Sequence, residues 1–246
     1  MGAPTAAFAV PIGSRDLSQL FSEIFETQTQ IERQMRRVRE PRVPTASVPM
    51  SQPPPSWFLK PGQIFTGWQH VTHWPPCKPE KWSVTVTIDS CNFATGEVLG
   101  SMFAYDVPGS EGLVTTYFEG EIIDNVNHTF YSDPDASDRA CVTEIRHWLR
   151  FPSFRPMRSS IVIEDGRTPA LVSSQKVFMR WKEKFFITGG DCRLTIEGLY
   201  YVTLDRKTGD IDAYYFDPNS APEQKLLLKA GATGSHGYSL PQAKFA

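Results

Sequence analysis

The chain has 246 residues, 40% of them hydrophobic, and its 25 basic and 27 acidic residues give a formal net charge of −2. This length suits one domain of moderate size with tails, and the balanced charge gives no indication of a nucleic-acid or anionic membrane partner. No apolar run approaches the ~20 residues that a membrane-spanning helix requires. Four cysteines without paired spacing predict free thiols in a reducing compartment, so we expect a soluble intracellular protein; they are Cys77, Cys91, Cys141 and Cys192.

The first predicted element is a helix over residues 14–40, because apolar residues recur there every three or four positions. This helix either docks on its own domain or binds a partner. Prolines between residues 41 and 55 predict an extended linker. We therefore divide the chain into a helix and linker (1–55), a folded domain (56–231) and a C-terminal tail (232–246).

Strand patterns dominate the folded domain. Alternating apolar residues predict strands over residues 64–71, 82–88, 97–105, 112–124, 176–188, 193–205 and 209–217. One helical insertion precedes the 176–188 strand, capped by Ser137 or Asp138, with Cys141, Ile145, Trp148 and Leu149 on its apolar side. Seven or eight strands joined mostly by turns indicate an antiparallel barrel or sandwich.

The strand 176–188 contains the most informative residue. One of its faces carries Val177, Met179, Trp181, Glu183 and Phe185, four of which are large and apolar. A carboxylate on such a row is costly unless a cation or strong donors meet it. The basic neighbours Lys182 and Lys184 project to the opposite face. Phe178 and Arg180 lie on that face too, and we interpret it as a solvated surface.

The strand 193–205 adds a phenol to the same interior. Its apolar row consists of Leu194, Ile196, Gly198, Tyr200, Val202 and Leu204. Since a buried tyrosine hydroxyl needs a partner, Tyr200 and Glu183 together would form a small site rich in acceptors. Such a site suits a bound ammonium group, for example the N-terminus of a peptide.

Other arrangements are weaker. Glu119 and Glu121 share a strand face like paired catalytic carboxylates, but they oppose an apolar row and are better explained as solvated. His70 and His73 lie near Cys77, but the fourth ligand of a zinc site is missing. We therefore expect neither a metal nor a cofactor.

Five blocks of the sequence are informative in combination and in this order. They are Thr-Thr-Tyr-Phe-Glu-Gly-Glu-Ile-Ile at 115–123, His-Trp at 147–148, Val-Phe-Met-Arg-Trp-Lys-Glu at 177–183, Gly-Leu-Tyr-Tyr at 198–201 and Ile-Asp-Ala-Tyr-Tyr at 211–215. On these blocks, residues 59–228 resemble the vacuolar import and degradation family, the substrate receptors of the GID/CTLH ubiquitin ligase. The resemblance implies an all-β fold, an eight-stranded antiparallel barrel with helical insertions, whose pocket binds the free N-terminus of degradation substrates, typically proline. It also implies a non-catalytic subunit of a cytoplasmic and nuclear ligase, bound through its C-terminal tail to an armadillo-repeat scaffold.

The resemblance assigns roles to particular residues. Glu183 and Tyr200 fall on the family's pocket glutamate and tyrosine, and Gln69 on its pocket glutamine. Thr195 replaces the family's serine, with its side chain expected to point away, so that its backbone would make any contact. The implied apolar lining is Val84, Met102, Ala104, Val107, Val114, Ile196 and Tyr215.

Some departures from the family pattern predict a pocket of changed shape. Ile196 stands in place of a phenylalanine, Ala104 is smaller than the usual branched residue, and the loop 186–193 is short. The tail matches poorly, with Phe245 as its candidate anchor.

Two other functions stay open at this point. A lipocalin-like carrier of a small apolar ligand would use the same barrel architecture. A hydrolase would use Glu183 together with a second inward-facing acid.

Overall fold

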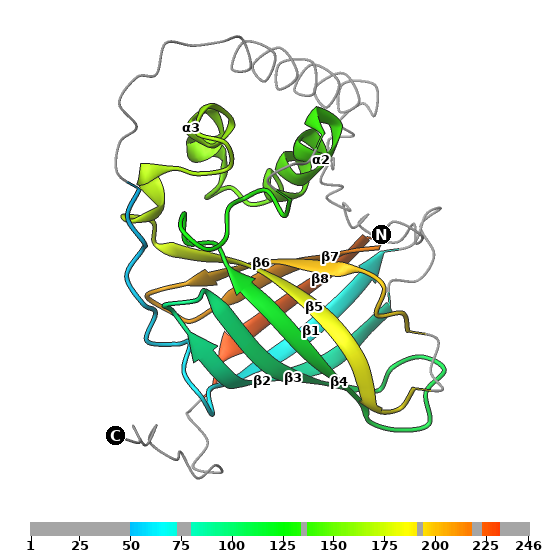
Figure 1. Cartoon of the computed structure of the whole chain (residues 1–246). Coiled ribbons are helices and arrows are strands. Elements are labelled where there is room, and N and C mark those ends of the chain that lie inside the picture. Colours follow the sequence, from blue (N-terminus) through cyan, green and yellow to red (C-terminus); the bar gives the residue numbers. More distant parts are fainter. Residues whose placement is uncertain (1–49, 73–79, 134–136, 191–193, 218–222, 232–246) are drawn as a thin grey trace, which may run out of the picture.

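The computed structural model describes residues 50–72, 80–133, 137–190, 194–217 and 223–231, and at its centre lies a closed antiparallel barrel of eight strands (Figure 1). The first four strands are β1 (Ile64–Thr72), β2 (Glu80–Asn92), β3 (Glu97–Tyr105) and β4 (Val114–Ile122). The others are β5 (Lys176–Thr188), β6 (Leu199–Asp205), β7 (Ile211–Phe216) and β8 (Glu223–Ala230). Because β8 pairs with β1, the sheet has no open edge. The barrel prediction is confirmed, and the sandwich is excluded.

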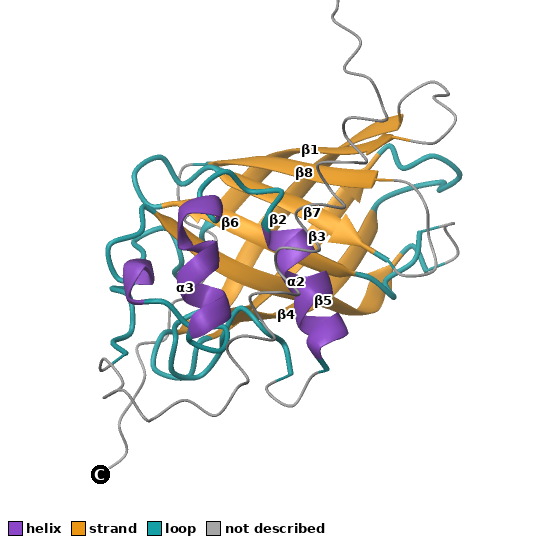
Figure 2. Cartoon of the chain, turned by 90° about the horizontal axis from the view of Figure 1, so that it is seen from above, coloured by secondary structure: helices purple, strands orange, loops and turns teal. Residues whose placement is uncertain are grey.

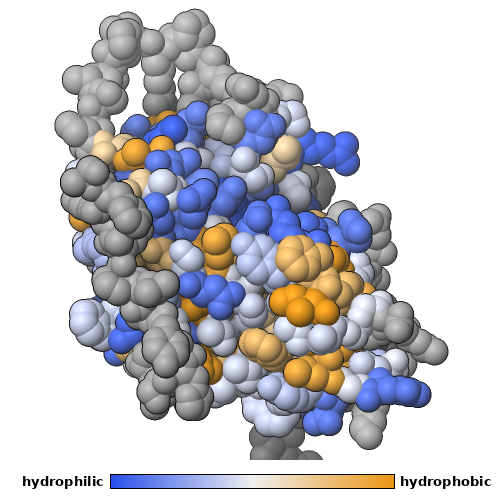
Figure 3. Space-filling view, turned by 60° about the horizontal axis from the view of Figure 1, so that its bottom comes forward, coloured by the Kyte–Doolittle hydropathy of each residue, from blue (hydrophilic) through white to orange (hydrophobic). Residues whose placement is uncertain are grey.

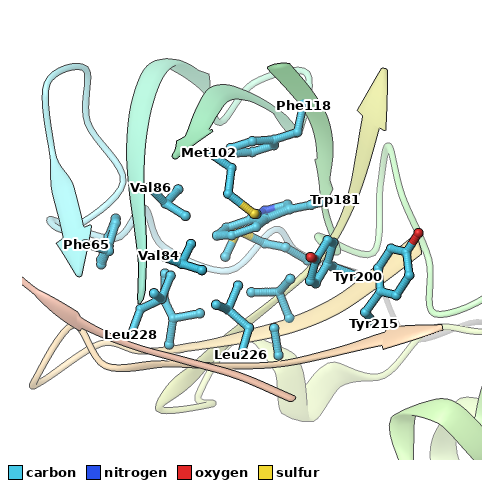
Figure 4. Close-up of a cluster of buried hydrophobic side chains, with 14 of the residues drawn as sticks. Phe65, Val84, Val86, Met102, Phe118, Trp181, Tyr200, Tyr215, Leu226 and Leu228 are labelled. Carbon is cyan, nitrogen blue, oxygen red and sulfur yellow. The ribbon is translucent and has the colours of Figure 1, made fainter. Parts of the chain in front are cut away.

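The barrel interior is filled by the rows that alternation predicts. In β2, Val84, Val86 and Ile88 are buried, while Ser83, Thr85 and Thr87 between them are only partly buried. Figure 4 shows how apolar side chains from different strands converge inside the barrel. Sequence alternation therefore identifies which side of most strands faces inward.

A helical layer covers part of the outer wall of the barrel (Figure 2). It contains α2 (Asp138–Trp148) and α3 (Arg158–Ile163), with 3-10 turns at Arg155–Met157 and Pro169–Leu171. Ser137, one of the two predicted caps, accepts a hydrogen bond from the Ala140 N–H. Of these helical elements, only α2 was predicted. Among the described residues, no helix is long and apolar enough to cross a membrane.

The helical layer explains why Phe178 on the outer face of β5 is not solvated. Its ring packs with Phe130, Trp148 and Phe154 in a second apolar cluster, with ring centroids 5.3–6.5 Å apart. Arg180 is also only 3% exposed. The prediction of a solvated basic face on β5 is therefore wrong for these residues, because the helical insertion between β4 and β5 folds back over this face of the strand.

One strand boundary differs from the prediction for a physical reason. The predicted strand 193–205 begins only at Leu199, and residues 194–198 form an irregular segment. Lys182 Nζ donates to the carbonyls of residues 196, 197 and 198 at 2.6–3.1 Å. The Lys182 ammonium thus satisfies three backbone carbonyls that would otherwise accept hydrogen bonds from a neighbouring strand. The strand β8 was not located within the sequence, although eight strands were expected.

The proline-rich segment before β1 is attached to the barrel in its described part. Gln52 Nε2 donates to Asp124 at 2.9 Å, and Arg206 donates to the carbonyl of Pro54 at 2.7 Å. Leu59 is buried against the barrel core. The predicted helix 14–40, His73, Cys77, Cys192 and the tail from residue 232 lie outside the described residues.

Candidate functional site

A cavity of about 390 Å³ occupies one end of the barrel, where β1 ends and β2 begins. All eight strands contribute to it. Its lining consists of Gln69, Val71, Glu80, Trp82, Val84, Met102, Ala104, Pro108, Gly109, Val114, Thr116, Glu183, Phe186, Leu194, Thr195, Ile196, Tyr200, Tyr215 and Gln224. A mostly apolar concave site with a few polar groups is the usual form of a ligand site.

Two stacked aromatic rings fill the barrel beside this cavity. The rings of Phe118 and Trp181 have centroids 4.7 Å apart (Figure 4). They fit because glycines lie against them: a Cβ on Gly100 would approach Phe118 to 2.5 Å, and one on Gly120 would approach Trp181 to 2.5 Å. The rings therefore fill the barrel interior, and neither of them is among the residues that line the cavity.

Glu183 is the polar centre of the cavity. It lies on the inward row of β5 and is 8% exposed. Its Oε1 accepts a hydrogen bond from the Thr116 hydroxyl at 2.5 Å. Within the described residues no cation forms an ion pair with it, since Lys182 projects to the other face and binds backbone carbonyls. The carboxylate is thus buried with one hydroxyl donor.

Burial raises the pKa of Glu183 to about 7, against smaller opposing effects of the Thr116 hydroxyl and the Lys182 charge. The native protein therefore binds this proton more tightly than the unfolded chain does. Stability is lost as the pH rises from about 4.5 through 7, and above that range the ionised group opposes folding in full.

We expect the Glu183→Gln variant to be more stable than wild type, because the amide stays neutral and can still accept from Thr116. Its advantage in unfolding free energy should be roughly 2 kcal/mol larger at pH 8 than at pH 5. Denaturant unfolding at both pH values measures this. The exposed Glu119→Gln is the control, and a pH-independent difference would contradict the assignment.

Two tyrosines lie side by side next to Glu183, with ring centroids 4.8 Å apart (Figure 4). The pKa of Tyr200 is raised, chiefly by burial and then by the charges of Glu183 and Tyr215, while the Gln69 side chain opposes the shift. Burial also raises the pKa of Tyr215 to about 12. Both phenols therefore stay neutral and can donate hydrogen bonds.

Tyr215 fixes the irregular segment that borders the cavity. Its hydroxyl donates to the Thr195 carbonyl at 2.9 Å and accepts from the Gly198 N–H at 2.8 Å. A side chain on Gly198 would collide with this ring, because its Cβ would lie 2.3 Å from Tyr215 Cζ. The segment 194–198 is thus held by Lys182 from one side and by Tyr215 from the other.

Gln69 provides a further acceptor. It is 1% exposed, its Nε2 donates to Gln224 at 2.9 Å, and its Oε1 has no partner among the described residues. Together with Glu183 it makes this part of the cavity rich in acceptors. Such a surface suits a cationic N–H donor that carries a small apolar group.

The structure brings ten of the eleven predicted site residues together around the cavity: Gln69, Val84, Met102, Ala104, Val114, Glu183, Thr195, Ile196, Tyr200 and Tyr215. Val107 is buried in the barrel core but does not line the cavity. Instead, its neighbours Pro108 and Gly109 do so. The Thr195 hydroxyl accepts from the Glu197 N–H at 3.1 Å, so its bond is local to the segment.

One inward residue of β5 was assigned wrongly. Phe185 was expected to face the interior, but it is 53% exposed and Phe186 lines the cavity instead. The pairing of β4 with β5 shifts between Tyr117 and Phe118, so that Phe118 pairs with Glu183 whereas Tyr117 pairs with Phe185. A β-bulge reverses the alternation beyond it.

Sequence reasoning also missed Thr116, which gives Glu183 its hydrogen bond. The signal was present, since Thr116 lies between Val114 and Phe118 on the same inward row of β4. Glu80 and Gln224 were missed as well, and nothing in the sequence marks these polar residues as inward-facing.

The weaker arrangements form no site among the described residues, and His73 and Cys77 lie outside them. Glu121 pairs with Arg180 at 2.8 Å, and Glu119 pairs with Lys184 at 2.8 Å, both on the outer wall. The solvated interpretation of these two glutamates is therefore confirmed. Neither Cys91 nor Cys141 forms a disulfide. Within the described residues, no three His, Cys, Asp or Glu side chains are grouped for metal binding.

The fold and the cavity define a class of protein: a closed β-barrel with a cavity built around a buried carboxylate. Residues 58–231 match the family model described as vacuolar import and degradation protein. Since this match covers more than half of the chain, the protein belongs to that family.

Three relatives illustrate the similarity. The glucose-induced degradation protein 4 homolog of Mus musculus is 26% identical over 61% of this chain and 70% of its own length. The GID complex substrate-recognition subunit 4 of Schizosaccharomyces pombe is 29% identical over 70% of this chain and 90% of its own length. Subunit 10 from the same yeast is 25% identical over 68% of this chain but only 33% of its own length.

Proposed function

We propose that this protein is a substrate receptor of a GID/CTLH-type ubiquitin ligase, and that its cavity binds the free N-terminus of proteins destined for degradation. The observation that carries the proposal is Glu183, a carboxylate buried in a mostly apolar cavity that receives, from the described residues, a hydrogen bond from one hydroxyl. The names of the two Schizosaccharomyces pombe relatives, which describe subunits of a GID complex that recognise substrates, support it independently.

The binding mechanism follows from the charges. An α-ammonium group carries its proton near neutral pH, because its ordinary pKa is about 7.7–8.0. In the cavity it would pair with Glu183 and thereby keep that carboxylate ionised. Tyr200 and Gln69 would hydrogen-bond the first residues. The surplus acceptors of the cavity are thus satisfied by the donors that a peptide N-terminus brings.

The apolar lining of the cavity would determine which kind of residue the substrate can have at its first position. Val84, Met102, Ala104 and Val114 offer an apolar surface of limited volume, which favours proline or a similarly small residue. Ile196 and Ala104 leave more room than larger residues would, so the cavity should also admit first residues other than proline.

The receptor would act without catalysis, holding the substrate while other subunits transfer ubiquitin for proteasomal degradation. We place it in the cytoplasm and nucleus, attached to an armadillo-repeat scaffold.

The two alternatives have less support. A carrier of a small apolar ligand would leave Glu183 without a cation and would give no reason for the similarity to substrate-recognition subunits. A hydrolase needs a second acid coupled to Glu183. Glu80 lines the same cavity, but burial, the Thr116 hydroxyl and the Lys182 charge account for the shifted pKa of Glu183.

A pair of matched peptides tests the proposal. A tetrapeptide that begins with proline should bind at least tenfold more tightly with a free N-terminus than after N-acetylation, because acetylation removes the charge that Glu183 requires. Isothermal titration calorimetry measures both affinities. A des-amino peptide, which lacks the charge without the added bulk, is the control. Equal affinities for the free and des-amino peptides would refute the proposal.

A further inference from the structure

An apolar patch lies on the outer wall of the barrel beside the cavity mouth. It consists of Phe103, Tyr105, Leu113, Tyr117, Phe185 and Ile187 from β3, β4, β5 and the loop before β4, and we name it the rim face. Phe185 and Ile187 are 53% and 54% exposed, and Tyr105 and Leu113 are exposed as well. Figure 3, which brings the lower side of Figure 1 forward, shows apolar side chains gathered on this side of the molecule.

The rim face differs from the neighbouring outer wall. The outward row of β2 carries Ser83, Thr85 and Thr87, as expected for a strand in contact with water. Directly beside it, Phe103 pairs with Thr85, and Tyr117 stacks on Phe185 with ring centroids 5.1 Å apart. Exposed apolar patches of this kind mark interaction sites more often than isolated apolar residues do.

The rim face is continuous with the cavity, because the same stretches of chain build both. Ala104 and Val114 line the cavity, and their neighbours Tyr105 and Leu113 face outward. In β5, Phe186 lines the cavity between the outward Phe185 and Ile187. A chain that leaves the cavity over this wall would meet the rim face directly.

We propose that the rim face binds the substrate polypeptide after it has left the cavity. This inference rests on the proposed function and extends it from the first residues of the substrate to the segment that follows them. The occupant is thus one continuous chain, with its N-terminus at Glu183 and an apolar or aromatic side chain on the Tyr117–Phe185 pair.

Strand geometry gives the substrate positions. Glu183 pairs with Phe118, which lies four residues along β4 from Val114 at the cavity mouth. The distance from Glu183 to the mouth is therefore roughly 13 Å, and an extended substrate chain needs about four residues to span it. After crossing the wall it would need roughly 10 Å to reach Tyr117 on the outside. The rim face therefore meets substrate positions of about 6–9.

The surroundings of the rim face suit a peptide backbone. The ion pair of Lys184 with Glu119 lies next to Tyr117 and Phe185 and leaves both charged side chains partly exposed. Polar groups at the border of an apolar centre can bind backbone carbonyls and N–H groups, as in other protein interfaces. The preferred substrate segment is therefore extended and apolar, rather than strongly charged.

The test compares three amidated peptides that share the sequence Pro-Ala-Ser-Ser at their N-termini. One is the tetrapeptide, one is a dodecapeptide with Phe and Leu at positions 6–9, and one is a dodecapeptide with Ser there. We expect the apolar dodecapeptide to bind the full-length protein about tenfold more tightly than either of the others, because it buries large apolar side chains. Fluorescence anisotropy measures all three.

The double variant Phe185→Ser/Ile187→Ser should lose this tenfold gain and keep the affinity for the tetrapeptide, and Leu113→Ser should lose part of the gain. The matched control is Val126→Ser/Ile163→Ser, which removes two exposed aliphatic residues far from the mouth and should keep the gain. Both substituted pairs are exposed, so the fold should tolerate the changes.

Three outcomes would overturn the inference. The first is a tetrapeptide that binds as tightly as the apolar dodecapeptide. The second is a gain that survives in Phe185→Ser/Ile187→Ser. The third is self-association of wild type that this variant abolishes without changing peptide affinity, which would make the rim face a contact between copies. If neither the short nor the long peptides bind, the proposed receptor function fails as well. Failure of the rim face alone differs from this, because the tetrapeptide then still binds.

Discussion

The Glu183→Gln variant should bind a proline-initiated tetrapeptide at least about 30-fold more weakly than wild type. The substitution keeps the shape of the side chain and its acceptor for the Thr116 hydroxyl, but removes the negative charge. The ammonium of the peptide would then be buried without a counter-ion. Truncating one partner of a desolvated charge pair costs roughly 2–5 kcal/mol, which corresponds to this factor or more.

The matched control for this variant is Glu119→Gln. Glu119 lies on the neighbouring strand β4, but its side chain faces outward and pairs with Lys184. We expect its affinity for the tetrapeptide to equal that of wild type. Thermal unfolding of both variants confirms that they are folded. If both variants lost affinity to the same extent, the result would contradict the claim that Glu183 pairs with the ammonium of the peptide.

The Trp181→Ala variant should lose about 3–5 kcal/mol of unfolding free energy, which is the usual cost of removing a buried tryptophan. Trp181 is 0% exposed, stacks on Phe118 and packs over Gly120, where no other side chain could fill the space. For a domain of this size the midpoint of thermal unfolding should fall by roughly 6–20 °C. Circular dichroism melts provide the measurement.

Trp57→Ala is the control for Trp181→Ala. Trp57 is 80% exposed and contacts Lys60 through its ring face. Its removal should change the unfolding free energy by less than about 0.5 kcal/mol. A Trp181 variant as stable as this control would mean that the stacked rings do not support the barrel.

Much of the barrel could be predicted from the sequence because its strands follow a simple period of two. In β2, Val84, Val86 and Ile88 alternate with hydroxyl residues, and the structure places the first group inside. The same period placed Glu183 and Tyr200 in the interior without any reference to relatives. Alternation is a local property of the chain, so a single sequence contains it.

The prediction failed where distant parts of the chain decide the outcome. The bulges in β5 move Phe185 outward and Phe186 inward, and they arise from the pairing with β4, not from the residues of β5 alone. Likewise, Phe178 is buried because a helical insertion covers the outer wall. The irregular segment 194–198 has the alternation of a strand, but Lys182 and Tyr215 bind its backbone groups.

The residues of the cavity likewise divide into those that could be predicted from the sequence and those that could not. Gln69, Glu183 and Tyr200 could be selected because a polar residue on an apolar row is visible in the sequence or matches a family motif. Thr116 was overlooked because threonine is common on both faces of strands. Gln224 could not be found, since β8 itself was not located within the sequence.

A thermodynamic cycle tests the central claim most directly. Calorimetry gives the affinities of wild type and Glu183→Gln for one proline-initiated tetrapeptide, with a free and with an acetylated N-terminus. If the ammonium pairs with Glu183, acetylation should weaken binding to wild type at least tenfold but change binding to Glu183→Gln by less than about threefold, because the partner of the charge is already gone. An equal penalty for acetylation in both proteins would contradict the account.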